Sequence, residues 1–339
     1  MLRFRVTFSA TGCLLVCLVL FISCSFLEEV KPKFSAENTG PYYLFKPYLN
    51  EVQALLDNED RHLTQAFEKL LERVEEDWLD QKPYSVVDNW QFEKERLSGT
   101  GRHDYVSLYS FAWPDPESPG EFIIKDGQRN PEVDKYDRVP LAKMSKAVED
   151  LSVAYYLTGD SLYAKKTAEF VKTWFLNEET HMNPHFEFTQ INPGEDTGRG
   201  LQGIVEARDF IPVIEGVSLI YESTYWTEDD HLKLKKWFHD FLRWIIRNYN
   251  ADAFDNALVR NGQTYGSNIA TWLDAQKTIY ALFTEQEDLL NSRQILPLSE
   301  SVKNRIDIHG SQPNELERGT PQHYTYFNMK GLILQAEMR

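Results

Sequence analysis

The chain has 339 residues, of which 52 are acidic and 36 basic, giving a formal net charge of −16 at pH 7. A surface of this sign repels nucleic acid and anionic lipid head groups at long range, which argues against both as partners. All three cysteines, Cys13, Cys17 and Cys24, lie near the N-terminus, so the remaining chain has no thiol for a disulfide, a zinc site or a nucleophile. Because the chain as a whole is acidic, an acidic ligand would require a local basic pocket.

Residues 1–23 have the pattern of an export signal. Arg3 and Arg5 precede an apolar stretch over residues 13–22, which is too short to predict a permanent membrane span. The string LFISC at residues 20–24 is similar to a bacterial lipobox, which makes Cys24 the expected lipidation site and residues 24–40 a tether. We expect an exported outer-membrane lipoprotein, periplasmic or surface-exposed, that meets the membrane only through this lipid.

The composition is uniform from about residue 41 onward, without a Gly/Ser linker, which predicts a single domain over residues 41–339. Apolar residues recur three and four positions apart in seven segments, whereas alternating strand patterns are scarce. The expected helices are Val52–Leu79, Leu141–Leu157, Ser161–Phe175, Gly200–Tyr221, Glu228–Asn248, Asn268–Leu282 and Tyr324–Glu337. Helix pairs joined by polar, aromatic-rich connections predict an all-α fold, an α/α toroid whose inner helices line a cleft.

The string ELERGTPQHY at residues 315–324 combines a cation, a helix start and a phenol. Thr320 is a suitable N-cap, and Pro321 suits the first helical position because its missing N–H costs nothing there. A helix is therefore predicted to begin at this point and to run through Met338. The sequence ends at Arg339, directly after this predicted helix, so we expect either an incomplete helical barrel or a shortened chain.

The same string predicts a perturbed phenol at Tyr324. Arg318 and the positive end of the helix dipole would both lower the pKa of Tyr324 from about 10 toward neutrality. The alternative interpretation is that Arg318 pairs with Glu315 or Glu317 at the surface while Tyr324 only packs.

Several polar and aromatic strings precede this one in the chain. They are YSVVD at residues 84–88, HDY at 103–105, WPDP at 113–116, KDG at 125–127, GRG at 198–200 and SNIATWLDAQ at 267–276. Taken together and in this order, the strings resemble the alginate lyase superfamily, all-helical toroid enzymes that cleave uronic-acid polymers by β-elimination. SFLEE at residues 25–29 is likewise similar to the export signal of Bacteroidota lipoproteins.

The resemblance implies roles for particular residues. Asn268 and Arg318 are expected to contact the uronate carboxylate, and Tyr324 is expected to act as acid and base. The reaction removes the C5 proton beside that carboxylate, so the carboxylate charge must be neutralised while a base and an acid move protons. No metal or cofactor is required. The expected cleft residues that contact substrate are His103, Tyr105, His185, Arg199 and Trp272.

One position departs from the family pattern. Family members usually have Asn-Asn-His where this chain has Ser267, Asn268 and Ile269. Tyr324 could act alone, which suits syn elimination at mannuronate- or glucuronate-type units, or His185 could substitute for the missing histidine. The third alternative is a lyase-like protein that binds without turnover.

The sequence thus gives three hypotheses for the function. The first is a polysaccharide lyase acting on an alginate- or glucuronan-like polymer, with the acidic polysaccharide as its partner. The second is a non-catalytic glycan-binding lipoprotein of the same fold. The third is a glycoside hydrolase, which would need two carboxylic acids across the cleft; Asp115, Asp126 and Asp196 are available, but no spacing pairs them.

Overall fold

The computed structural model describes residues 34–35, 38–44, 46–89, 99–192, 200–248, 267–292 and 294–338. The expected leader and Cys24 lie outside these residues. Residues 34–339 form one compact unit. Among the described residues, no helix has the length and apolar character needed to cross a bilayer.

The described elements are mainly helical, and the strands are short. The larger helices are α2 (Lys46–Asp57), α3 (Arg61–Arg73), α4 (Arg138–Thr158), α5 (Ser161–Phe175), α6 (Ile211–Leu219), α7 (Glu228–Asn248), α9 (Asn268–Phe283) and α13 (Pro321–Glu337). The shorter helical pieces are η1 (Val74–Trp78), η3 (Pro131–Lys135), η4 (Gly200–Phe210), α10 (Glu287–Leu290), α11 (Leu298–Arg305) and α12 (Pro313–Leu316). The strands are β1 (Val106–Leu108), β2 (Ala112–Pro114), β3 (Phe122–Ile124) and β4 (Phe188–Ile191).

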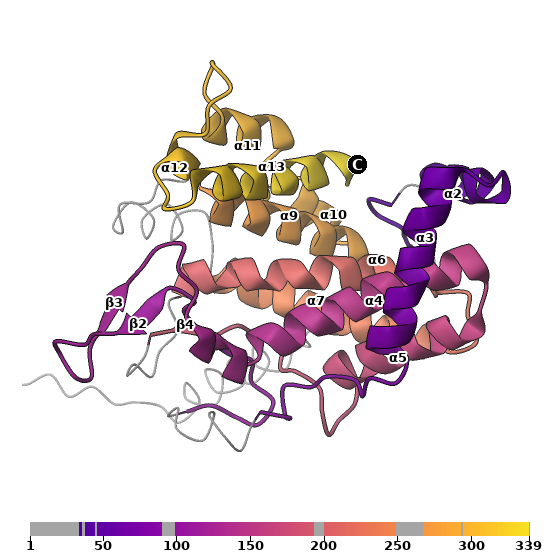
Figure 1. The fold of residues 1–339 in the computed structure, drawn as a ribbon, viewed down its shortest axis with the longest axis horizontal. Helices are drawn as coiled ribbons and strands as arrows, with labels where there is room; N and C mark the ends of the chain where they lie inside the picture. The colour runs from indigo at the N-terminus through magenta and orange to yellow at the C-terminus, as the bar shows by residue number, and fades with distance from the viewer. Residues whose placement is uncertain are drawn as a thin grey trace, which may run out of the picture. The chain divides into compact units, whose positions relative to one another are not determined.

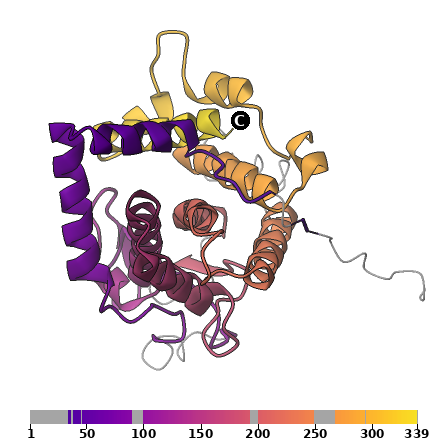
Figure 2. The ribbon, with the colours of Figure 1, turned by 90° about the vertical axis from the view of Figure 1, so that its right-hand side faces the viewer.

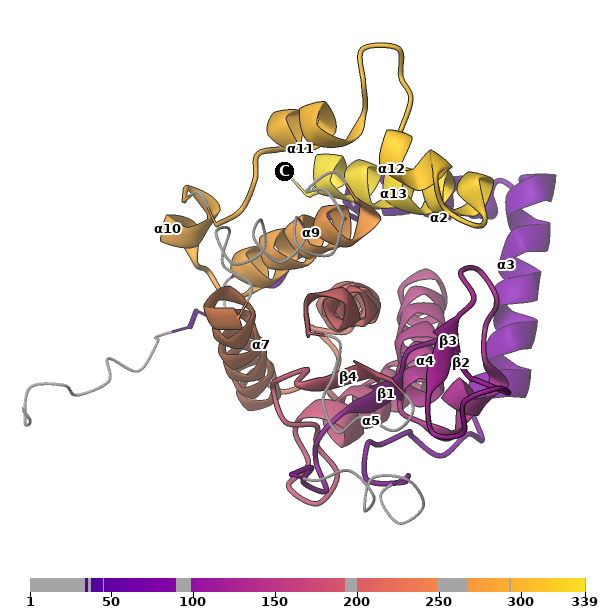
Figure 3. The ribbon, with the colours of Figure 1, turned by 90° about the vertical axis from the view of Figure 1, so that its left-hand side faces the viewer.

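The helices of this unit are arranged around a common centre, as the two end-on views show (Figures 2 and 3). Helix α4 contacts α5 and α6, α6 contacts η4, and α9 contacts η4, α7 and α13. This arrangement confirms the predicted all-α toroid. At one end of the helices lie the β2–β3 hairpin and α12 (Figure 1), so residues from distant parts of the sequence meet there.

The core that supports this end is rich in aromatic residues. Phe175 contacts both Phe210 and Trp237 edge-to-face, with ring centroids 5.4 and 4.7 Å apart, and Phe210 contacts Trp237 at 5.4 Å. Edge-to-face contacts add to the free energy gained by burying the rings. The core thereby fixes α5, η4 and α7 relative to one another.

The helix predicted over Val52–Leu79 is interrupted. Glu59 has φ of +56°, and the side chain of Asp60 accepts hydrogen bonds from the amides of His62 and Leu63. Asp60 therefore ends one helix and caps the next, because its carboxylate satisfies amides that have no partner within α3. The prediction was wrong at this turn, since apolar periodicity continues across it.

The strands are small and local. β1 pairs in parallel with β4, and β2 pairs with β3 in an antiparallel hairpin in which Trp113 is opposite Ile123. The chain leaves this hairpin at Ile124 and continues into the loop 125–128. The hairpin thus places that loop at the end of the helices where α12 lies.

A buried carboxylate holds the N-terminal segment against α6. Glu215, which is 2% exposed, accepts hydrogen bonds from the amides of Tyr42 (2.7 Å), Tyr43 (3.1 Å) and Leu44 (3.3 Å). Burial raises the pKa of Glu215 from 4.5 to about 7, although the three amides oppose this shift. Glu215 therefore titrates near neutrality while it holds this segment.

This raised pKa predicts a pH-dependent stability. A carboxyl group whose pKa is higher in the folded state contributes stability that is present below its unfolded pKa and is lost as pH rises through the folded value. Replacing Glu215 by Gln should therefore reduce the fall in the free energy of unfolding between pH 5 and pH 8 by up to about 3 kcal/mol. Urea unfolding at the two pH values measures this, with Glu68→Gln on the exposed face of α3 as control. Equal pH dependence in wild type and Glu215→Gln would contradict the assignment.

Candidate active site

A cavity of about 540 Å³ lies at the end of the helices where the β2–β3 hairpin and α12 are found. Asn268, Arg318 and Tyr324, the three residues predicted to carry the chemistry, all line it. Asn268 is the first residue of α9, Arg318 lies in the turn after α12, and Tyr324 is in the first turn of α13. The structure thus brings the three predicted residues to one site.

Helix α13 places Tyr324 in this cavity. It begins at Pro321, with Thr320 in the N-cap position, as predicted from the sequence. The backbone amide of Tyr324 donates to the carbonyl of Thr320 at 3.2 Å, which is the first hydrogen bond of the helix. The phenol is consequently held on a regular helical turn, where its position is fixed by the backbone.

Arg318 is held by a carboxylate from the loop after β3. Its Nε and Nη2 donate to Oδ2 and Oδ1 of Asp126 at 3.2 and 2.8 Å, and the amide of Gly319 donates to Oδ2 at 2.7 Å. A Cβ at Gly319 would lie 2.9 Å from the carbonyl oxygen of Asp126, so glycine allows this close approach. Neither surface pairing considered for Arg318 is present, because Asp126 takes that role.

The bound guanidinium lies over the phenol. The Cζ atom of Arg318 is 3.7 Å from the ring centroid of Tyr324, and the hydroxyl of Tyr324 is 3.5 Å from Oδ1 of Asp126. The pKa of Tyr324 is raised to about 12, chiefly by burial; the nearby Arg318 acts in the opposite direction, whereas Asp126 and Tyr109 contribute to the rise. The expected fall in this pKa was therefore wrong, because burial and Asp126 together outweigh the single cation. Tyr324 is protonated at neutral pH.

A second carboxylate orients Asn268. Glu315, which is 1% exposed, accepts hydrogen bonds at 2.6 Å from both the backbone amide and the Nδ2 of Asn268. This contact joins α12 to the first turn of α9. One N–H of the amide group is used in this bond, and within the described residues no partner is recorded for the other N–H or for the amide oxygen.

Most of the charged residues that line the cavity are basic. The basic lining residues are Arg129, Arg138, Arg208, Arg318 and Lys330. Glu206 supplies the one carboxylate among the lining residues. Four of these cations also pair with carboxylates outside the lining, Arg129 with Asp134, Arg138 and Arg208 with Asp209, and Arg318 with Asp126. Cations therefore outnumber carboxylates in the lining itself, although the chain has a formal net charge of −16.

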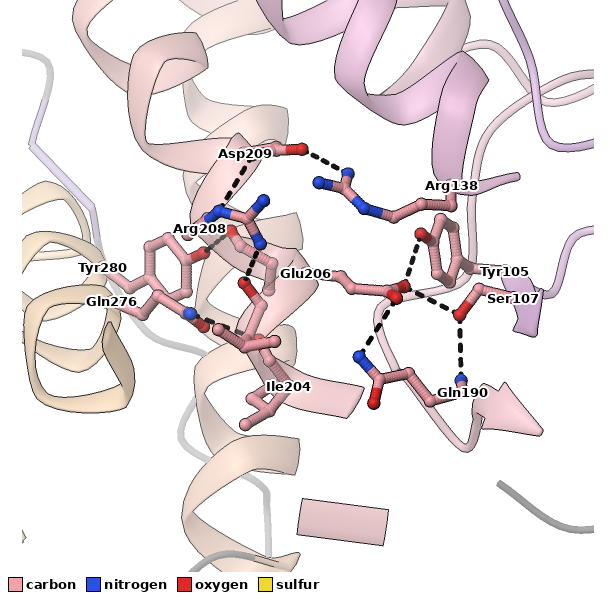
Figure 4. Close-up of polar contacts among 12 residues, drawn as sticks. Tyr105, Ser107, Arg138, Gln190, Ile204, Glu206, Arg208, Asp209, Gln276 and Tyr280 are labelled. Carbon is pink, nitrogen blue, oxygen red and sulfur yellow. Dashed lines mark hydrogen bonds and ion pairs between the residues drawn. The ribbon is translucent and has the colours of Figure 1, made fainter. Parts of the chain in front are cut away.

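The carboxylate of Glu206 belongs to a buried network beneath the cavity (Figure 4). It accepts hydrogen bonds from the hydroxyls of Tyr105 (2.8 Å) and Ser107 (2.7 Å) and from Nε2 of Gln190 (3.3 Å). Because its oxygens are taken up by these donors, Glu206 fixes the wall formed by β1, β4 and η4.

Two basic side chains of the lining share one aspartate in the same view. Asp209 forms ion pairs with Arg138 and, at 3.6 Å, with Nε of Arg208 (Figure 4). The guanidinium of Arg208 also lies 5.2 Å from the ring centroid of Phe327 on α13. The network therefore fixes the direction in which the two arginines meet the cavity.

Tyr105 and Trp272, which were expected to contact substrate, are buried and lie outside the lining of the cavity. Tyr105 is fully buried, and its hydroxyl faces Glu206 rather than the cavity. Trp272 is 7% exposed, stacks on Phe327 with ring centroids 5.1 Å apart, and donates from Nε1 to the Phe327 carbonyl at 3.2 Å. Each contacts a lining residue from the core side: Tyr105 contacts Glu206, and Trp272 contacts Phe327.

The predicted histidines lie elsewhere. Nδ1 of His103 is 2.5 Å from the carbonyl oxygen of His181, and the two rings stack at 4.6 Å. Nε2 of His185 is 3.0 Å from Oδ1 of Asp104. Neither His103 nor His185 belongs to the lining of the cavity, and Arg199 lies outside the described residues.

The sequence reasoning missed several lining residues. Glu206 and Arg208 lie in a segment predicted only as a helix, and His323 directly precedes the predicted phenol. The sequence could have indicated His323, because it directly precedes Tyr324 in a helix that was predicted to reach the cleft. Within the described part of the chain, no group of three or more His, Cys, Asp or Glu side chains is arranged to hold a metal ion.

The fold and the cavity together define an all-α toroid protein with several basic side chains in its candidate site. Comparison with known proteins agrees with this class. The sequence model of the family described as Alginate lyase matches residues 92–339. A crystal structure of an alginate lyase from Bacteroides ovatus is similar to this chain with a TM-score of 0.77 and 31% sequence identity, covering 88% of this chain and 76% of that one. No curated protein matches the chain.

The chain therefore belongs to the alginate lyase family. Family and fold together support a polysaccharide lyase in general, and the family suggests an acidic polysaccharide as substrate.

The position of Asp126 beside Arg318 and Tyr324 predicts how a substitution at Asp126 changes the pKa of Tyr324. Asp126→Asn removes a negative charge that raises the pKa of Tyr324, so this pKa should fall relative to wild type. NMR titration of protein labelled at tyrosine Cζ measures it, with Tyr324→Phe identifying the resonance. Asp115→Asn is the control, because its carboxylate contacts the amide of Glu117 instead of Arg318. An unchanged Tyr324 titration in Asp126→Asn would contradict the assigned contact.

Proposed function

We propose that the protein cleaves a uronic-acid-containing polysaccharide, alginate- or glucuronan-like, by β-elimination. The observation that carries this proposal is the meeting of Arg318, Asn268 and Tyr324 in one basic cavity. The reaction needs cations or dipoles at a carboxylate and a proton donor at the neighbouring leaving oxygen. This cavity offers both within one lining.

Arg318 and Asn268 would neutralise the carboxylate of the sugar. Asp126 occupies Nε and Nη2 of Arg318, and no partner of Nη1 is recorded within the described residues. The guanidinium can therefore hold Asp126 on one edge and a substrate carboxylate on the other, because it carries five N–H donors in a fixed plane. As negative charge develops on the carboxylate during proton removal, these donors would stabilise it.

Tyr324 would protonate the departing oxygen. Its pKa of about 12 keeps the phenol protonated at neutral pH, which is the state that a proton donor needs. The adjacent Arg318 then stabilises the phenolate left after the transfer, since it is 3.7 Å from the ring. The phenol thus acts first as an acid and regains its proton afterwards.

The hydrolase hypothesis receives less support. Two carboxylic acids would have to face each other across the cleft. Asp126 is held by Arg318 and Gly319, and Glu206 is held by two hydroxyls and an amide. Neither carboxylate is free to act in the way that glycoside hydrolysis demands.

The proposal is tested by the ultraviolet absorbance of the unsaturated uronide that elimination forms. Polyuronates are incubated with the purified protein, and wild type should give a rising absorbance. Tyr324→Phe should lower the rate about 10² to 10⁴-fold with binding largely kept, because it removes only the proton donor. Tyr326→Phe is a matched control, since this phenol on the same helix is 67% exposed and outside the lining.

A second variant tests the carboxylate contact. Arg318→Ala should weaken binding and lower the turnover rate about 10² to 10³-fold, because both the bound substrate and the transition state lose the guanidinium. Arg243→Ala on the exposed face of α7 is the control. Binding without any absorbance change in wild type would favour the glycan-binding alternative, and reducing ends without the chromophore would favour hydrolysis.

A further inference from the structure

The cavity leaves one step of the elimination without an assigned residue. A base must take the C5 proton, yet Tyr324 is protonated at neutral pH because its pKa is about 12. Ile269, which follows Asn268 in the lining, has an aliphatic side chain and cannot accept a proton. Under the proposed function, a basic lining residue suits this step better than a protonated phenol.

The carboxylates near the cavity are already engaged. Glu206 is 2% exposed and accepts hydrogen bonds from Tyr105, Ser107 and Gln190. Asp126 is bound to Arg318 through both of its oxygens. A carboxylate that gives up such donors in a buried site loses the interactions that keep it charged.

His323 has the chemistry and the position that the step requires. It lines the cavity, its side chain is exposed, and its ring lies edge-on to that of Tyr324 with centroids 5.3 Å apart. Among the described residues, no hydrogen bond or ion pair of its imidazole is recorded, so a ring nitrogen is available. Neutral imidazole accepts protons near physiological pH and is the side chain most often used as a general base.

Two aromatic rings of α13 lie beside the imidazole of His323. The imidazole is nearly parallel to the ring of Phe327, at 6.1 Å and 5°, and Phe327 itself stacks on Trp272 at 5.1 Å. The charged groups that face the same cavity are Glu206 from η4, Arg208 from η4, Arg318 from the turn before α13, Arg129 and Arg138 from the segment around η3, and Lys330 from α13. Most of them are cations, which favour the approach of a carboxylate ligand to this cavity.

We propose that His323 is the general base of the elimination, an assignment that rests on the proposed function. An imidazole nitrogen of His323 takes the C5 proton, and the electrons of the C5–H bond form the C4–C5 double bond. The C4–O bond breaks, and the departing oxygen receives the phenolic proton of Tyr324. The imidazolium then returns a proton to the phenolate through solvent, so that no water, oxidant or reductant is consumed.

The placement of the two groups also selects a stereochemistry. His323 and Tyr324 are successive residues of one helical turn and meet the cavity from the same wall. Base and acid on one side of the sugar perform a syn elimination. The preferred substrate is therefore a polymer whose C5–H and C4–O bonds lie on the same face, as in mannuronate- or glucuronate-type units.

The assignment is tested by replacing the imidazole. His323→Gln should lower kcat about 10²-fold or more on polymannuronate or polyglucuronate, with a smaller change in KM. Adding free imidazole to His323→Ala should restore part of the rate, because the small base can enter the space left by the side chain. His309→Gln is the matched control, since this exposed histidine lies in the loop before α12 and outside the lining.

Relocating the base gives a second readout. Ile269→His in the His323→Gln background should recover activity, because it returns an imidazole to the same cavity from α9. Full activity of His323→Gln would overturn the assignment, as would a loss that neither free imidazole nor Ile269→His relieves. If wild type itself forms no unsaturated product, the proposed function fails as well; product formation by wild type and equally by His323→Gln overturns only the role of His323.

Discussion

The site depends on the carboxylate of Asp126. This single group contacts Arg318 at two atoms, the amide of Gly319, and the hydroxyl of Tyr324 at 3.5 Å. Asp126 and Arg318 are 192 positions apart in sequence, so this contact brings the β2–β3 hairpin onto the start of α13. Close approach is possible because Gly319 and Gly127 carry no Cβ; a Cβ at Gly127 would lie 3.1 Å from Thr320. The guanidinium is thereby fixed over the phenol before any ligand binds.

In this arrangement, Arg318 and Asp126 have opposite effects on the pKa of Tyr324. A lone arginine beside Tyr324 would lower its pKa, but burial and Asp126 raise it to about 12. The phenol is thus kept protonated, while within the described residues no partner is recorded for Nη1 of Arg318. Accepting a proton then falls to a different side chain, and His323 is the lining residue whose type and surroundings suit that task. In the proposed reaction, the acid and the base are adjacent residues that line the same cavity.

Local patterns in the sequence predicted much of this structure. Apolar periodicity identified the major helices, and the Thr320–Pro321 pair located the start of α13 because capping is determined by a few neighbouring residues. The shared position of Asn268, Arg318 and Tyr324 followed from the resemblance to a family. The turn at Glu59 was missed because apolar periodicity runs across it, while the cap at Asp60 is a single polar residue.

Long-range partners could not be predicted in the same way. Nothing near Arg318 in sequence indicates that Asp126 will displace Glu315 or Glu317 as its partner, nor that Glu315 will turn to Asn268, 47 positions away. His185 similarly pairs with Asp104, because the fold brings their two loops together. Such contacts depend on which carboxylate the fold brings within reach, and their effect on a pKa can reverse the direction expected from neighbours alone.

A crystal structure of Tyr324→Phe with a bound oligouronate tests the central claim most directly. The account predicts that the carboxylate of one sugar contacts Nη1 of Arg318 and the amide of Asn268, with its C5–H bond facing His323 and its C4 oxygen facing position 324. Asp126 should remain bound to the other edge of the guanidinium. An oligouronate whose carboxylates all lie away from Arg318 and Asn268 would contradict the account.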